Sequence, residues 1–141
     1  MRRFLMAAAL AVALPGVAHA ADGGPTPAPE GARVYIIAPA DGATVSNPVH
    51  VVFGLSGMGV APAGIEHENT GHHHLIIDAP LPPLDEPIPS DEHYRHFGNG
   101  QTEATIELTP GKHTLQLLLG DQNHIPHTPP VLSPPITITV E

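Results

Sequence analysis

Histidines are the residues of this chain whose number and spacing could support chemistry. Three of them stand together in residues 69–78, NTGHHHLIID, directly before an apolar run. If this segment is a strand, His72 and His74 share one face about 6.6 Å apart by strand rise, while His73 points to the other face. Two neutral imidazoles at that separation can converge on one metal ion.

Histidines elsewhere could supply a third nitrogen. His124 and His127 lie in a late loop, where Pro126 excludes a regular helix, so their rings need not share a face. His67 lies in the loop before the three histidines. The strand pair with His124 or His127 would form an open three-nitrogen site of the kind that divalent copper, zinc or nickel accept. Asp121 could orient one ring by accepting its second N–H.

The remaining candidates have ordinary explanations. The histidines of residues 93–96, HYRH, have helical spacing, but Arg95 beside them argues against a cation site. His50 and His113 stand singly within or beside strand-like segments, which is typical of surface or hydrogen-bonded residues. Met58 could bind cuprous ion as a thioether, although a loop methionine usually packs against the core.

Charge and cysteine content limit the partners of this chain. Asp and Glu number 14 and Lys and Arg 5, which gives a net charge of −9, and there is no cysteine. An acidic surface disfavours nucleic acid and anionic lipid, because both require a basic patch. Without thiols the chain has neither disulfides, zinc–thiolate sites nor a blue-copper centre. Any metal must therefore be held by nitrogen or oxygen.

Enzymatic motifs are incomplete, and we expect that the protein is not an enzyme. HENTG, from His67, shares two residues with the metalloprotease motif HExxH but has Gly71 at the place of the second histidine. The sequence has no glycine-flanked nucleophilic serine and no cysteine. GNGQTE at 98–103 leads into a strand-like segment, whereas a phosphate-binding loop precedes a helix.

The chain divides into three predicted parts. Residues 1–20 have the layout of a secretory signal peptide, with Arg2 and Arg3, an apolar run and a small-residue cleavage signal, which predicts a periplasmic or secreted protein. No later run is long enough to span a membrane. Residues 21–32 are rich in Pro and Gly and predict a flexible tether. Residues 33–141 form one domain.

That domain is predicted to be all-β, because its apolar segments are strand-length, rich in Val, Ile, Leu and Thr, and separated by turn residues. We expect a small antiparallel sandwich of six to seven strands with long loops, immunoglobulin-like or cupredoxin-like. Either Leu75 and Ile77 or Ile76 could face the core. The predicted strands are 34–38, 49–55, 73–78, 102–108, 114–119 and 135–140.

The immunoglobulin-like order predicts which loops meet. Loops 56–71 and 120–134 emerge at the same end of such a sandwich, which brings His67, His124 and His127 to the start of the three histidines. The turn before His113 lies at the opposite end. Segment 79–101 must cross back before the next strand, and so can bring His96 to the same end.

Three motifs resemble the signature of a family of bacterial exported domains of unknown function: GHHHLIID, HFGNGQTE and GDQNH. The resemblance covers about residues 33–141 and implies a periplasmic or secreted all-β domain with no assigned activity. Because His96 belongs to this signature, we retain it as a candidate ligand. The matching positions are His72, His73, His74, His96, Phe97, Gly98, Gly100, Gln101, Thr102, Glu103, His113, Gly120, Asp121 and His124.

Two hypotheses follow from the sequence. The first is a periplasmic protein that binds a divalent metal ion, copper or zinc, through His72, His74 and His124, with His67, His96 or His127 as additional ligands. The second is an immunoglobulin-like interaction or structural module that binds no metal, whose histidine network holds its loops and which docks an envelope protein.

Overall fold

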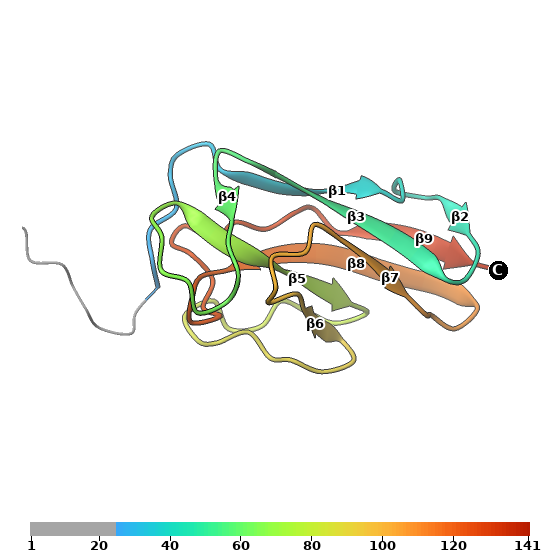
Figure 1. Ribbon diagram of the computed structural model, residues 1–141. Helices are drawn as coiled ribbons and strands as arrows, with labels where there is room; N and C mark the ends of the chain where they lie inside the picture. Colours follow the sequence, from blue (N-terminus) through green and yellow to red (C-terminus); the bar gives the residue numbers. More distant parts are fainter. Residues whose placement is uncertain (1–24) are drawn as a thin grey trace, which may run out of the picture.

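The computed structural model describes residues 25–141, which form strands and loops without a helix (Figure 1). The predicted signal peptide, 1–20, lies outside the described residues. The prediction of an all-β fold is confirmed. The strands are β1 (Arg33–Ala38), β2 (Thr44–Val45), β3 (Val49–Ser56), β4 (Gly59–Val60), β5 (Thr70–Ile77), β6 (Tyr94–His96), β7 (Glu103–Ile106), β8 (Gly111–Gly120) and β9 (Ile136–Val140).

The strands form two sheets that pack as a sandwich. One sheet has the order β1-β3-β7, and the other has the order β2-β9-β8-β5-β4, with β6 also paired to β5. All six predicted strands are present. The short strands β2, β4 and β6 were not predicted, because two or three residues cannot display an alternating pattern. β5 begins at Thr70, before the predicted 73, so that all three histidines lie within it.

The main core lies between the two sheets. Phe53 of β3 packs there with Leu75 and Ile77 of β5, which identifies the face of β5 that points inward. Ile76 points to the opposite face, where it packs in a second cluster with Leu118 of β8. The apolar run of β5 is explained by this arrangement, since the strand is buried on both of its faces.

Segment 79–93 supplies much of the cover over the outer face of β5. Ile88 is buried in the second cluster, and its backbone N–H donates to the carbonyl oxygen of His124 at 2.8 Å. Loops 56–71 and 120–134 meet as predicted, because the Gly64 N–H donates to the Gln122 carbonyl at 3.0 Å. Figure 1 shows that β5 begins at the end of the sandwich opposite to the C-terminus.

The described part of the predicted tether is attached to the domain. The Ala28 N–H donates to the carbonyl of Thr128, whose own N–H donates to the carbonyl of Thr26. A flexible tether over all of 21–32 is therefore wrong for residues 26–28, which pack beside the 120–134 loop because their backbone groups find partners there.

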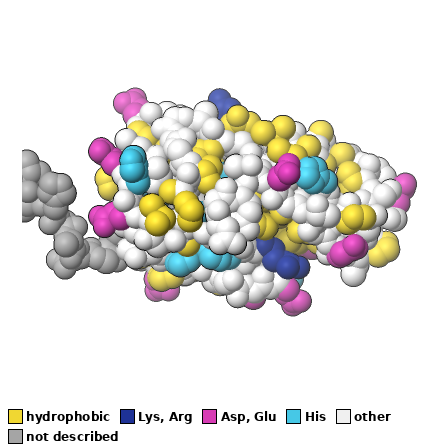
Figure 2. All heavy atoms as spheres, in the orientation of Figure 1, with side chains coloured by type: hydrophobic (Ala, Val, Ile, Leu, Met, Phe, Trp, Pro, Cys, Tyr) yellow, Lys and Arg dark blue, Asp and Glu magenta, His cyan; other side chains and the backbone are white. Residues whose placement is uncertain are grey.

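Acidic side chains outnumber basic ones on the face shown in Figure 2. This distribution agrees with the net charge of the chain. Over residues 25–141, no helix has the length and apolar character needed to cross a membrane.

Candidate metal centre

Strand alternation places His72 and His74 side by side on the outer face of β5. Their ring centroids are 4.7 Å apart, and their side chains are almost completely buried, with 1% and 0% of their surface exposed. The prediction that these two rings share a face is confirmed. Burial follows from the position of β5, which has β8 on one side and β4 and β6 on the other.

The third ring comes from β6, because His96 lies directly opposite His74 in the antiparallel register. Its centroid lies 5.0 Å from those of both His72 and His74, and the Nε2 atoms of His72 and His96 are 3.2 Å apart. One ligand atom from each of these three residues lies within 4.8 Å of the other two. Three imidazoles in this arrangement could hold a metal ion.

Strand β6 removes the objection to a metal ligand within residues 93–96, which was the charge of Arg95. Arg95 pairs with Leu75 and therefore points to the face opposite to His96. Its Nε donates to the carbonyl of Glu92, at 3.2 Å. His93 does not join the cluster, because its Nδ1 lies 2.9 Å from the carbonyl oxygen of Ile77.

The fourth ring, His124, stands in the loop after β8. Its centroid is 4.7 Å from that of His96, 5.1 Å from that of His72 and 6.2 Å from that of His74. The ring is partly exposed, and the backbone has a positive φ of 66°, which turns the chain sharply. We define the histidine cluster as His72, His74, His96 and His124.

Asp121 builds the turn that carries His124. Its fully buried carboxylate accepts hydrogen bonds from the backbone N–H groups of Asn123 and Ile125, at 2.8 and 3.0 Å, and from the Thr26 hydroxyl, at 3.2 Å. Within the described residues it accepts no hydrogen bond from an imidazole. The expectation that Asp121 orients a ring directly is therefore wrong, because its oxygens are occupied by the loop backbone.

Two glycines provide the space for rings of the cluster. A Cβ atom at Gly120 would lie 2.7 Å from Cε1 of His74, and one at Gly98 would lie 2.6 Å from Nε2 of His96. Real Cβ atoms do not approach other atoms so closely. Both glycines belong to motifs seen in the sequence, but nothing in the sequence indicated that they leave space for imidazole rings.

Burial and mutual repulsion disfavour the charged forms of His72, His74 and His96. Burial is the main cause that lowers the pKa of His72 to about 4, and the rings of His96 and His124 add to it. Burial likewise lowers the pKa of His74 to about 2, with contributions from the other three rings. The pKa of His96 is also lowered, by burial and by His124. These three rings are therefore neutral at neutral pH, as metal ligands must be.

Several buried nitrogens of the cluster lack hydrogen-bond partners among the described residues. These are Nδ1 of His72 and both ring nitrogens of His74. A neutral imidazole offers one N–H and one lone pair, and leaving either unpaired in the interior costs about 1–3 kcal/mol. This pattern needs an explanation beyond packing.

His73 has a different environment on the inner face. Its ring packs against Phe53, with centroids 5.1 Å apart, and it is fully buried in the sandwich core. Burial lowers its pKa to about 4, and neither ring nitrogen finds a hydrogen-bond partner in residues 25–141. Strand alternation predicted that His73 points away from His72 and His74, but it did not identify His73 as a core residue.

His67 and His127 lie apart from the cluster. In the exposed ring of His67, Nδ1 donates to the carbonyl oxygen of Glu68 at 3.0 Å. Nε2 of His127 lies 3.1 Å from the carbonyl oxygen of Thr70. Both line an open surface pocket of about 410 Å³ with acidic neighbours. The structure does not bring either of these predicted additional ligands to the histidine cluster, because the loop turns at His124 and carries His127 elsewhere. Met58 packs against the main core.

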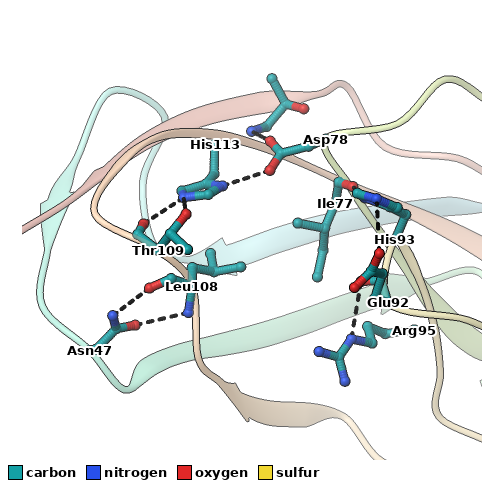
Figure 3. A network of polar contacts seen from close by, with 10 residues as sticks. Asn47, Ile77, Asp78, Glu92, His93, Arg95, Leu108, Thr109 and His113 are labelled. Atoms are coloured by element: carbon teal, nitrogen blue, oxygen red, sulfur yellow. Dashed lines mark hydrogen bonds and ion pairs between the residues drawn. The ribbon is translucent and has the colours of Figure 1, made fainter.

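His113 lies at the far end of β8, as predicted. Its Nδ1 donates to a carboxylate oxygen of Asp78 at 2.6 Å, and its Nε2 to the carbonyl of Thr109 at 2.7 Å (Figure 3). The hydrogen bond with Asp78 is the main cause that raises the pKa of His113. His50, at 3.4 Å from Glu103, is a half-exposed surface residue.

Comparison with known proteins gives a family but no activity. No curated protein and no solved structure matches the chain. Residues 51–141, which include all four residues of the histidine cluster, match the family described as domain of unknown function DUF4399. The chain therefore belongs to the DUF4399 family.

Proposed function

We propose that the protein binds a divalent transition-metal ion through His72, His74 and His96, with His124 beside them. The observation that carries this proposal is the convergence of three ligand atoms within 4.8 Å of one another. These imidazoles are neutral because burial and neighbouring rings lower their pKa values. An ion would accept the lone pairs that the surrounding protein leaves unused.

The alternative, a histidine network that only holds loops in place, is less well supported. A structural network stabilises a fold by pairing its donors and acceptors, as His113 does with Asp78 and Thr109. In contrast, both ring nitrogens of His74 are unpaired within the described chain. An ion would pair with the lone pair of one of these nitrogens and so offset part of the cost of burying the ring.

Export to the periplasm or the exterior belongs to the same proposal. It is supported by the signal-peptide layout of residues 1–20. We infer a non-enzymatic role, such as metal binding or carriage, since the sequence lacks a complete catalytic motif.

Isothermal titration of tag-free protein with Zn²⁺ and Cu²⁺ tests the proposal. We expect one ion per chain, and a loss of affinity of at least about a hundredfold in His72→Ala and His74→Ala. His67→Ala is the matched control, because His67 is exposed and outside the cluster, and it should bind as the native protein does. Affinity no tighter than millimolar, or equal affinity in all variants, would contradict the proposal.

A further inference from the structure

The arrangement of the four rings carries information about which ion they fit. Five of the six centroid separations in the histidine cluster lie between 4.7 and 5.1 Å, and only that between His74 and His124 is longer, at 6.2 Å. Four points with nearly equal separations lie at the corners of a tetrahedron.

The dimensions agree with this geometry. A zinc–imidazole bond of about 2.0–2.1 Å puts each centroid roughly 3.2 Å from the ion. A tetrahedron then separates every pair of centroids by about 5.2 Å, whereas a square plane gives four separations of about 4.5 Å and two of about 6.4 Å.

A square-planar arrangement is inconsistent with the separation between the rings of His72 and His96. If His74 and His124 were opposite corners, His72 and His96 would be the other opposite corners, yet their centroids are 5.0 Å apart. Their Nε2 atoms are 3.2 Å apart. Opposite nitrogens of a square plane are about 4.1 Å apart, and those of a tetrahedron about 3.3 Å.

From this geometry we propose that His124 is the fourth ligand of a closed, tetrahedral, all-imidazole site that favours Zn²⁺ over Ni²⁺; the inference rests on the proposed function. Zn²⁺ accepts a tetrahedron without penalty, whereas Ni²⁺ prefers square-planar or octahedral coordination. Within residues 25–141, the ligand atoms within 4.8 Å of one another come from His72, His74 and His96 only, and the His124 ring is 6.2 Å from that of His74. To coordinate, the His124 ring must therefore turn inward, which its partly exposed loop position permits.

A closed site has a functional consequence. Four protein ligands leave no coordination position for water, and zinc hydrolases need such a position to generate hydroxide. The tetrahedral site therefore holds or carries its ion. The buried rings of His72 and His74 form its fixed side, and the partly exposed rings of His96 and His124 form the side through which an ion enters.

Substitution with Co²⁺ tests the geometry directly. Tetrahedral Co²⁺ absorbs visible light strongly and octahedral Co²⁺ weakly, so the Co²⁺-loaded native protein should absorb strongly until one equivalent of Zn²⁺ displaces it. His124→Ala should lose most of this absorption while His67→Ala keeps it. Zn²⁺ should bind the native protein at least about tenfold more tightly than Ni²⁺.

The possible failures are distinguishable. If calorimetry detects binding of neither Co²⁺ nor Zn²⁺, the proposed function itself is refuted. If Co²⁺ binds with weak octahedral absorption, if His124→Ala leaves the spectrum unchanged, or if Ni²⁺ binds as tightly as Zn²⁺, metal binding stands and the closed tetrahedral site is refuted. Circular dichroism of His124→Ala checks that the variant is folded.

Discussion

Two histidine sites at opposite ends of β5 differ in their hydrogen bonds and in the direction in which their pKa values are shifted. At the far end His113 donates from both nitrogens, to Asp78 and Thr109, and its pKa is raised. In the histidine cluster the neighbours are other imidazoles, and the pKa of His74 falls to about 2. The same kind of side chain thus has an acceptor for each ring nitrogen in one place and is a neutral base with unpaired ring nitrogens in the other.

The largest expected effect is the stabilisation of the folded protein by bound metal. It should depend on the histidine cluster and not on the pair Asp78–His113. Saturation with Zn²⁺ at about a hundredfold excess over Kd should raise the free energy of unfolding by about 2.7 kcal/mol. His74→Ala should abolish this gain, and Asp78→Asn should leave it intact. Calorimetric melting with and without Zn²⁺ measures it, and an equal gain in both variants would remove the distinction between the sites.

The next largest effect is expected from removing the Asp121 carboxylate, whose hydrogen bonds differ from those of Asp78. Asp121 serves the loop backbone beside the cluster, whereas Asp78 serves the ring of His113. Asp121→Ala leaves two backbone N–H groups without acceptors, so urea unfolding should show a loss of about 2–3 kcal/mol together with weaker metal binding. Asp85→Ala, at an exposed position, is the control for charge and should change neither quantity.

A smaller gain in stability is expected from replacing the buried imidazole of His73. His73→Leu replaces a ring without hydrogen-bond partners among residues 25–141 by an apolar side chain, so stability should rise by about 1 kcal/mol with metal affinity unchanged. His113→Leu should instead destabilise the folded protein, because the Asp78 carboxylate loses the imidazole N–H that donates to it. Chemical unfolding of both variants decides the matter. A loss of stability in His73→Leu would mean that the ring has a partner it requires.

The smallest effect is the pH dependence of the pair Asp78–His113. Because the pKa of His113 is raised in the folded state, its contribution is complete below about pH 6.5 and is lost as pH rises through the folded value. Burial opposes ionisation of Asp78, but hydrogen bonds from His113 and Thr114 outweigh it and lower the pKa, so this contribution is lost as pH falls below 3.8.

The pair should therefore be strongest between about pH 4 and 6.5. Asp78→Asn should cost under about 1 kcal/mol at pH 5, since the carboxylate is 37% exposed and partly screened, and less at pH 8. Unfolding of the native protein and the variant at both pH values measures the difference. A cost that is greater at pH 8 than at pH 5 would show that His113 is neutral in the native state.

The sequence predicted the features that depend on local periodicity and on strand order. Alternation placed His72 and His74 together, and the immunoglobulin-like loop order placed His124 near them. The crossing of segment 79–101 allowed His96 to reach the same end, but the sequence could not place it beside His74, because β6 is three residues long and its register with β5 is a tertiary contact. Nor could it place His127, because alternation does not specify a loop conformation such as the turn at His124, which is held by hydrogen bonds from Asn123 and Ile125 to Asp121.

Gly98 and Gly120 have no side chains, yet they decide where two rings of the cluster can lie. The Cβ of an alanine at either position would occupy space that the ring of His96 or His74 fills. Over evolutionary time the glycine and its neighbouring imidazole should therefore be inherited together: homologous chains that replace Gly120 should also have replaced His74, and those that replace Gly98 should have replaced His96.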